Sequence, residues 1–495
     1  MPAPTTPPRL VPEPTLLDVR AGAPFVVSAA TAVTVGTEPA EVSLGILAAE
    51  VLSRVSGSTV EVRYREVAEP DQAGDVALRL DPAAHAGEHY RVDVAAERVV
   101  IEAGTAEGLV RGLATLHQLL RPHGGTFAAW PVHVEDSPVH GWRGLSIDVA
   151  RHFFGPAQLR VVVEVMAYYK LNVLHLHLSD DQGWRLDLAS RPLLAERSGD
   201  GAVGGDPGGF LTAEEYESLV AFAAVRGVRV VPELDVPGHV NAALHAYGEL
   251  TPSGEATEAY TGIEVGFSRL HADLPGTEPF LRDVFGDVAA MTPGEYVHIG
   301  GDEVLTMDAE EYARLVAMAA AAVRDAGKKV VGWQEIAHTP LEPGTVVQYW
   351  DTRVDPAPFV AAAKAGARLL MSPGSRAYLD MKYDADTELG LEWAGHIELR
   401  DSYEWDPTDL VPGLPDGSVI GVEAAVWTET LRGLDDLMTM LLPRLAAVAE
   451  VAWTPRDRRD WSSFAERIAA HGPYWDAQGL SWYPSPQVDW HVDRS

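Results

Sequence analysis

The sequence predicts an α/β fold, in which a (β/α)8 TIM barrel follows a smaller N-terminal α+β domain. Strand-like and helix-like segments alternate after Pro138, and eight of these segments have the character of strands. The length of 495 residues accommodates a barrel of roughly 250 residues or more plus a second unit. A doubly wound sheet is the competing architecture, but it usually has fewer strands and a Gly-rich phosphate loop, which this sequence lacks.

The first part of the chain is expected to form a proline-rich arm and then a small domain. Residues 1–14 should be extended, because proline disfavours both helix and sheet. The small domain is predicted over residues 15–137. Its apolar patterns predict strands at 59–64, 75–80 and 97–103 and helices at 39–55 and 105–120. It contains no cluster of catalytic residue types.

The barrel is predicted over residues 138–495. Helical patterns at 156–170, 212–227 and 309–327 follow three of its strands. Residues 336–344, between the fifth and sixth strands, are too few for a crossover helix, whereas a long insertion before the eighth strand has the character of a binding loop. The eight strands are expected at 143–150, 172–180, 229–236, 296–304, 329–335, 345–350, 368–373 and 418–427.

Composition limits the partners of the protein. The formal net charge is −34, from 38 Lys and Arg against 72 Asp and Glu, which disfavours binding to nucleic acid and to anionic membranes. There are no cysteines, so disulfides and thiolate chemistry are excluded. We expect no metal and no cofactor. The start of the chain lacks a basic segment followed by an apolar run, which favours a cytoplasmic location, or secretion if a leader was removed.

Polar and aromatic residues gather where the predicted barrel strands end. Active sites of such barrels lie at the carboxyl ends of the strands. Arg143 is an exception among the candidates, because it opens the first strand. The residues at strand ends are Asp180, Asp235, His239, Asp302, Glu303, Trp333, Trp350, Trp427 and Glu429.

Acids and tryptophans together indicate a carbohydrate ligand. Indole rings pack on the apolar faces of pyranose rings, and carboxylates bind the hydroxyl groups at the edge. Glycosidases generally place two carboxyl groups on opposite sides of the scissile bond. Asp302 and Glu303 are adjacent, so they are poorly placed for that arrangement. One acid/base fits better, with a nucleophile from elsewhere, for which the substrate itself is a candidate.

Several motifs resemble those of family 20 glycoside hydrolases, the β-N-acetylhexosaminidases. The resemblance covers nearly the whole chain, including the small N-terminal domain. The motifs are RGLSIDVARHFF (143–154), HLHLSDDQGWR (175–185), PELDVPGH (232–239), HIGGDEV (298–304), GWQE (332–335), YWDT (349–352), YLDMKY (378–383) and VWTE (426–429).

The resemblance implies exo-acting, retaining hydrolysis of terminal β-linked N-acetylhexosamine from a small-molecule or oligosaccharide substrate. The acetamido oxygen of the sugar attacks the anomeric carbon and forms an oxazoline-type intermediate. Glu303 is then the general acid and base. Asp302 holds the acetamido N–H, and Tyr378 binds the acetamido oxygen.

The same resemblance assigns residues to the sugar pocket. Trp333, Trp350 and Trp427 would form the walls around the acetamido group. Arg143 and Glu429 would bind ring hydroxyls.

Further residues are implied around this pocket. Asp380 and Trp393 would contact the sugar near its hydroxymethyl group or the next unit. Asp235 and His239 would form a polar relay behind the general acid, which Asp180 supports.

Two other functions remain open at this point. His175 and His177 face one side of a strand, as in metal-dependent amidohydrolase barrels, and His239 and His298 could add ligands. That function leaves the tryptophans and paired acids without a role. A non-catalytic sugar-binding barrel is the other alternative, but such a protein typically lacks the acid that Glu303 supplies.

Overall fold

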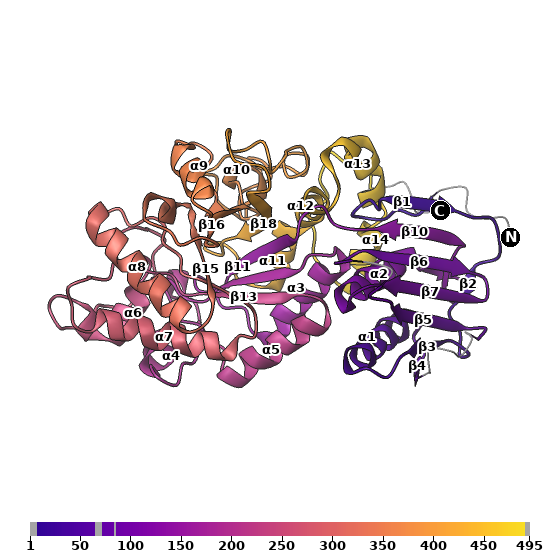
Figure 1. The fold of residues 1–495 in the computed structure, drawn as a ribbon, viewed down its shortest axis with the longest axis horizontal. Helices are drawn as coiled ribbons and strands as arrows, with labels where there is room; N and C mark the ends of the chain where they lie inside the picture. Colours follow the sequence, from indigo (N-terminus) through magenta and orange to yellow (C-terminus); the bar gives the residue numbers. More distant parts are fainter. Residues whose placement is uncertain (1–6, 65–71, 84–85, 491–495) are drawn as a thin grey trace.

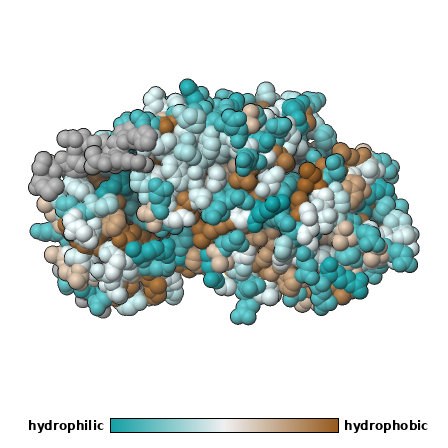
Figure 2. Space-filling model, turned by 180° about the vertical axis from the view of Figure 1, so that it is seen from behind, coloured by the Kyte–Doolittle hydropathy of each residue, from teal (hydrophilic) through white to brown (hydrophobic). Residues whose placement is uncertain are grey.

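The computed structural model describes residues 7–64, 72–83 and 86–490, which form two parts lying side by side (Figure 1). The smaller part is built on a sheet from the N-terminal third of the chain, and the larger part is a barrel. Hydrophilic and hydrophobic residues are interspersed on the face shown in Figure 2. Among the described residues, none of the helices has the length and apolar character needed to cross a membrane.

The small domain contains a seven-stranded mixed sheet and a three-stranded sheet. Helices α1 (Pro39–Ser56) and α2 (Ala106–Leu119) pack on the larger sheet through buried leucines, and both helices lie where the sequence predicts them. The strands of the larger sheet lie in the order β1 (Leu16–Val19), β10 (Val132–Asp136), β6 (Tyr90–Ala95), β7 (Arg98–Ala103), β5 (Asp75–Leu80), β3 (Ala32–Val35), β4 (Glu61–Tyr64). The strands of the smaller sheet lie in the order β2 (Phe25–Val26), β9 (Thr126–Ala129), β8 (Arg121–His123). The three predicted strands are therefore β4, β5 and β7.

The barrel is closed and consists of eight parallel strands, which confirms the predicted fold. Its last strand pairs with its first, with Gly421 opposite Trp142. All eight strands lie within or at the edge of the predicted ranges. They are β11 (Trp142–Asp148), β12 (Val173–His177), β13 (Arg229–Glu233), β14 (Tyr296–His298), β15 (Lys329–Trp333), β16 (Val346–Tyr349), β17 (Arg368–Met371) and β18 (Val419–Val426).

Helices and long loops surround the barrel. Between β15 and β16 only a 3-10 turn, η3 (Gln334–His338), is present, as the short spacing predicts. The insertion between β17 and β18 includes the short helix α10 (Gly374–Ala377). The other elements are α3 (Pro156–Tyr168), α4 (Leu193–Ser198), η1 (Val203–Gly205), α5 (Ala213–Val225), α6 (Asn241–Ala246), η2 (Gly248–Leu250), α7 (Thr277–Met291), α8 (Ala309–Asp325), α9 (Ala357–Lys364), α11 (Leu434–Leu441), α12 (Arg444–Trp453), η4 (Arg456–Arg458), α13 (Trp461–Ala469) and α14 (Gly472–Gln478).

The described part of the N-terminal arm, residues 7–14, has neither helix nor strand, as predicted, but it is held tightly at the domain junction. Leu10 and Val11 are buried. Gln118 of α2 exchanges two hydrogen bonds with the backbone of Val11, at 2.9 and 2.7 Å. Arg467 of α13 donates to the carbonyl of Leu10 at 2.8 Å. The arm therefore joins the small domain to the C-terminal helices. Residues 1–6 lie outside the described residues.

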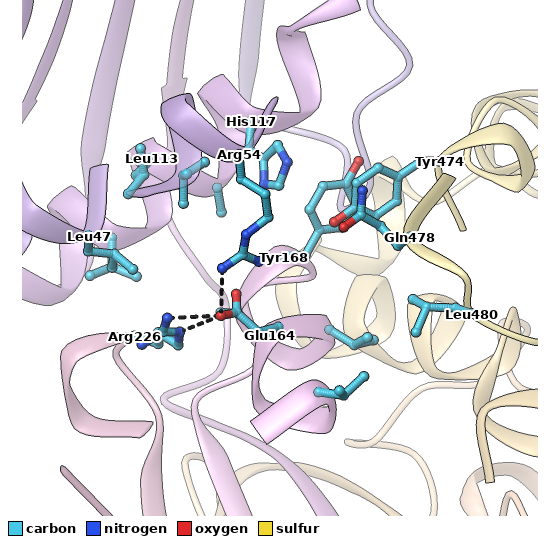
Figure 3. A pocket seen from close by; sticks show the side chains of 16 residues that line it. Leu47, Arg54, Leu113, His117, Glu164, Tyr168, Arg226, Tyr474, Gln478 and Leu480 are labelled. Carbon is cyan, nitrogen blue, oxygen red and sulfur yellow. Dashed lines mark hydrogen bonds and ion pairs between the residues drawn. The ribbon is translucent and has the colours of Figure 1, made fainter. Parts of the chain in front are cut away.

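A cavity of about 180 Å3 lies at the same junction, between α1, α2, α3 and α14 (Figure 3). Glu164 of α3 pairs with Arg226 at 2.8 Å and with Arg54 of α1 at 3.5 Å. Ion pairs therefore connect the small domain to the barrel beside this cavity.

Candidate active site

The segment that contains Asp302 and Glu303 is a sharp turn, not the continuous strand expected over 296–304. Strand β14 ends at His298, and φ is +70° at Gly300, +109° at Gly301 and +51° at Glu303. A Cβ atom on Gly300 would lie 1.7 Å from an oxygen of Asp235, so only glycine fits there. A positive φ at Glu303 is uncommon outside glycine and costs of the order of 1 kcal/mol. The turn allows adjacent side chains to reach one pocket, which a pleated strand would prevent.

His239 lies next to both acids. Its Nε2 is 3.5 Å from Glu303 Oε2 and 3.8 Å from Asp302 Oδ2. The side chain of Asp302 is only 11% exposed, whereas that of Glu303 is 35% exposed. Burial lowers the pKa of His239, but the charges of Asp180 and Asp302 outweigh it and raise this pKa well above the ordinary value. The imidazolium therefore stabilises negative charge on Asp302.

Asp180 lies behind His239 and has no oxygen left for a substrate. Its Oδ1 is 3.2 Å from His239 Nδ1, and its Oδ2 is 2.8 Å from both His177 Nε2 and Arg151 Nη2. Burial opposes ionisation, but these cations hold the pKa of Asp180 well below its usual range. The prediction that Asp180 binds substrate is therefore wrong. Asp180 instead supports His239, as the sequence analysis also expected.

Asp235 supports the turn and the first acid. Its Oδ1 accepts the backbone N–H of Gly301 at 3.0 Å. Burial and the nearby charge of Asp302 raise the pKa of Asp235 well above its ordinary value. Burial also raises the pKa of Asp302, although the charge of His239 acts against this rise. The protonated form is therefore favoured more strongly at Asp235 than at Asp302.

Five aromatic side chains are grouped beside Asp302. Ring centroids of Trp333 and Trp427 are 5.8 Å apart, and those of Tyr378 and Trp350 are 6.2 Å apart in a stacked arrangement. Trp393 meets Tyr378 edge-on at 5.6 Å and is 42% exposed at the rim. The structure therefore brings together all the aromatic residues that the sequence analysis predicted for the sugar pocket.

Two further acids lie near this group, and of these Asp380 is buried and Glu429 is half-buried. Burial and the charge of Glu429 raise the pKa of Asp380 well above its usual range. Burial also raises the pKa of Glu429, whose Oε2 has no hydrogen-bond partner among the described residues. A buried oxygen without a partner is costly, so it is suited to a ligand hydroxyl.

Arg143 is not in this site, and its predicted role in substrate binding is wrong. It lies near the amino end of β11, at the end of the barrel opposite Asp302 and Glu303. The guanidinium donates to Glu88 of the small domain at 3.0 and 2.6 Å and to the carbonyl of Lys170 at 3.0 Å. Arg143 is fully buried and connects the two domains.

Sequence comparison places the chain in a family. The sequence model of the glycosyl hydrolase family 20 catalytic domain matches residues 140–318 and 307–456, and the model of domain 2 of that family matches residues 7–137. The chain belongs to glycosyl hydrolase family 20. Family 20 enzymes are exo-acting, retaining glycosidases that use substrate-assisted catalysis, and this chain is one of them.

Named relatives of this family 20 chain agree with that activity. A β-N-acetylhexosaminidase of Cellulomonas fimi is 64% identical over 483 residues, which is 97% of each chain. The N-acetyl-β-hexosaminidase of Streptomyces plicatus, solved with thio-NAglucal, has a TM-score of 0.94 at 42% identity over 99% of both chains. A mutant of that enzyme, solved with its product GlcNAc, has a TM-score of 0.93.

Arg151 is a residue of the family 20 site that the sequence prediction missed. It follows the carboxyl end of β11, and its guanidinium contacts Asp180 and lies 5.1 Å from the centre of the Trp427 ring. Its Nε has no hydrogen-bond partner among the described residues. Arg143 and Arg151 belong to the same motif, and the rule that barrel sites lie at the carboxyl ends of strands would have selected Arg151.

Glu335 is a second missed residue. Its Oε2 accepts the indole N–H of Trp350 at 3.3 Å. Burial and the charge of Asp302 raise the pKa of Glu335 to about 8. It is the last residue of the GWQE motif, directly after β15, so its position at a strand end was the available signal.

His175 and His177, which suggested a metal-dependent amidohydrolase, each lie between two carboxylates. His175 lies between Glu423 (2.9 Å) and Glu233 (3.0 Å). His177 lies between Glu233 (2.6 Å) and Asp180 (2.8 Å). Although burial opposes it, Glu233 raises the pKa of His175 to about 9 and that of His177 well above its usual value. These carboxylates occupy the ring nitrogens as ion-pair partners, and the arrangement therefore favours the family 20 function.

Proposed function

We propose that Glu303 is the general acid and base of this glycosidase and that Asp302 orients the acetamido group of the substrate. The adjacent pair at the turn after β14 carries this proposal, because the two acids differ in exposure and partners. Glu303 is open to solvent, where a leaving group and a water molecule can reach it. Asp302 is buried beside the aromatic group, where it can accept the acetamido N–H.

The proposed reaction has two steps. The acetamido carbonyl oxygen attacks the anomeric carbon while Glu303 gives a proton to the departing glycosidic oxygen. The resulting oxazolinium ion carries its positive charge next to Asp302. Glu303 then takes a proton from water, whose oxygen attacks the anomeric carbon and reopens the ring, so the configuration is retained. Tyr378 donates a hydrogen bond to the acetamido oxygen and holds it in line.

The remaining residues bind the sugar. Trp333, Trp350 and Trp427 surround the acetamido methyl group. Arg151, in the role first assigned to Arg143, and Glu429 bind ring hydroxyls.

Asp380 and Trp393 lie toward the hydroxymethyl group in this proposal. His239 and Asp235 act as the relay that sets the charge state of the two acids, and Asp180 anchors His239.

The proposed substrate is an oligosaccharide with a terminal, non-reducing β-linked GlcNAc or GalNAc. The GlcNAc complex of the Streptomyces plicatus enzyme supports the first of these. The net charge of −34 suits a neutral glycan. We also propose that the domain boundary lies at residues 137 and 138, with all catalytic groups in the barrel.

The assignment is tested by comparing Glu303→Gln with the wild type on a 4-nitrophenyl and on an alkyl N-acetyl-β-glucosaminide. A general acid matters most for a poor leaving group, so we expect a larger loss of kcat/KM on the alkyl substrate. A thiazoline mimic of the cyclised acetamido sugar should inhibit the wild type. Equal turnover by Glu303→Gln, or failure of the thiazoline to bind, would contradict the mechanism.

A further inference from the structure

The peptide group that joins Gly301 to Asp302 is held by a side chain from another element. The hydroxyl of Tyr312, in the first turn of α8, donates to the carbonyl oxygen of Gly301 at 2.6 Å. Among the described residues, no other group forms a hydrogen bond with this peptide. Because a peptide group is planar, this oxygen and the Cα atom of Asp302 lie in one plane. The Tyr312 hydroxyl therefore fixes the plane from which the Asp302 side chain extends.

The carboxylate of Asp302 is weakly held by its own contacts. Its Oδ1 is buried and has no hydrogen-bond partner among the described residues. Its Oδ2 lies 3.8 Å from Nε2 of His239, which is longer than a hydrogen bond. The direction in which this carboxylate points therefore depends largely on the backbone that carries it.

The preceding peptide group, between Gly300 and Gly301, is held at both ends by other residues. The N–H of Gly301 donates to Asp235 at 3.0 Å, and the carbonyl of Gly300 accepts the backbone N–H of Trp333 at 2.9 Å. Gly301 separates the two peptide groups, and a glycine rotates more freely than any other residue. Fixing the first peptide therefore does not fix the second, which depends on the hydroxyl of Tyr312.

Tyr312 is itself fixed at the start of α8. Its N–H donates to the carbonyl of Asp308 at 3.0 Å, and the Asp308 side chain caps the helix by accepting the N–H of Glu311 at 2.9 Å. Glu311 in turn accepts a hydrogen bond from Arg269 at 3.0 Å. The first turn of α8 is thus a rigid support for the phenol ring.

The hydroxyl of Tyr312 also keeps its proton. Burial, together with the charges of Glu335 and Asp302, raises the pKa of Tyr312 well above its ordinary value. The group therefore stays neutral and remains a hydrogen-bond donor to Gly301 whenever the neighbouring acids are charged.

We propose that Tyr312 is a positioning residue, whose hydroxyl sets the direction of the Asp302 carboxylate toward the acetamido group of the substrate. This inference rests on the proposed role of Asp302. Without the hydroxyl, the peptide could rotate about Gly301, and the acetamido oxygen would be held less well in line with the anomeric carbon. Small displacements of an orienting group lower the rate of such an attack.

Tyr312→Phe tests the proposal, because it removes the hydroxyl and keeps the ring. Tyr216→Phe is the matched control, since Tyr216 is a buried tyrosine of α5 whose hydroxyl also has one partner, Thr292 at 2.8 Å. Tyr312→Phe should lower kcat by roughly five- to tenfold, the effect of one hydrogen bond, and leave KM near the wild-type value. The inhibition constant of the thiazoline mimic should rise by a similar factor. Tyr216→Phe should keep the wild-type kcat and inhibition constant.

Two comparisons show whether the effect passes through Asp302. The 4-nitrophenyl and alkyl N-acetyl-β-glucosaminides should lose the same factor in Tyr312→Phe, because the acetamido group attacks in both. A larger loss on the alkyl substrate would instead indicate a displaced Glu303. In the Asp302→Asn background, Tyr312→Phe should have little further effect.

The outcomes separate this inference from the catalytic proposal. Wild-type kcat in Tyr312→Phe, or an equal loss in Tyr216→Phe, would overturn the inference and leave the role of Asp302 intact. A larger loss on the alkyl substrate, or losses that simply add in the double variant, would overturn it as well. If Asp302→Asn alone kept wild-type turnover, the proposed role of Asp302 would fail, and the inference with it.

Discussion

The guanidinium of Arg151 lies 2.8 Å from the carboxylate of Asp180, at the carboxyl end of the barrel. Arg143, eight residues earlier in the sequence, opens the same strand and binds Glu88 at the opposite end. The two arginines thus serve different parts of the molecule. One belongs to the sugar site, and the other joins the two domains.

Substitution of each arginine by lysine should separate these roles. Lysine keeps the charge but loses the planar set of donors. Arg151→Lys should lower kcat/KM by roughly ten- to a hundredfold, the effect of one charge-assisted hydrogen bond, with little change in thermal stability. Arg143→Lys should lower the melting temperature and leave kcat/KM near the wild-type value. A folded Arg143→Lys variant with the larger catalytic loss would contradict this assignment.

Asp302→Asn should lower kcat by orders of magnitude. The amide presents no negative charge to the oxazolinium ion, and an NH2 group turned toward the acetamido N–H cannot accept its hydrogen bond. Removing a buried charge should not destabilise the fold. Steady-state kinetics together with thermal unfolding measure both effects. Wild-type turnover by this variant would remove Asp302 from the mechanism.

Glu335 should make stability fall as pH rises. Its pKa is raised from 4.5 to about 8, so the folded state binds a proton that the unfolded state has released between these values. Folding then becomes less favourable from pH 4.5 to about 8, and the effect is complete above pH 8. In Glu335→Gln this contribution is absent. The free energies of unfolding of both proteins are measured with denaturant at pH 5, 6.5 and 8. The value for the variant minus the value for the wild type should increase steadily as the pH rises. A difference that is independent of pH would contradict the raised pKa of Glu335.

Glu233 should act as a positioning residue for Trp333. Its Oε1 accepts the Trp333 indole N–H at 2.8 Å, and its Oε2 accepts from His177 at 2.6 Å. A glutamine would turn its NH2 group toward one of these donors. We expect Glu233→Gln to lower kcat/KM by roughly tenfold, within the range for one lost hydrogen bond to a charged group.

A double-mutant cycle identifies the route of this effect. Trp333→Phe removes the indole N–H but keeps an aromatic wall. If Glu233 acts through Trp333, the losses caused by the two substitutions should be less than additive. Strict additivity of the two losses in kcat/KM would show that Glu233 acts independently of Trp333.

Much of this molecule could be predicted from its sequence, because the signals were local. The strands that became β11 to β18 are short segments rich in apolar residues, and Trp333, Trp350 and Trp427 stand where such segments end. Asp302 and Glu303 were identified as unsuited to act on opposite sides of a sugar, and the turn after β14 explains how they share a pocket.

Other features depend on contacts between distant residues. The choice of Arg143 failed because its partner, Glu88, lies in another domain. The partners of Asp180 come from three separate segments, so its lack of free oxygens was not visible in the sequence. The expected strand at 296–304 was too long because Gly300 must avoid Asp235, a steric condition set by the neighbouring strand.

The N-terminal arm links the two ends of the chain in space. Residues 9 and 10 are bound through their carbonyl groups to His471 and Arg467, and Glu13 donates its N–H to Glu450. During synthesis, these partners leave the ribosome only after more than four hundred further residues have been added. The small domain can form its sheet early, but residues 9–13 find these partners only after α12 and α13 have been synthesised. The contacts of the arm at the domain junction therefore form later than the sheet of the small domain.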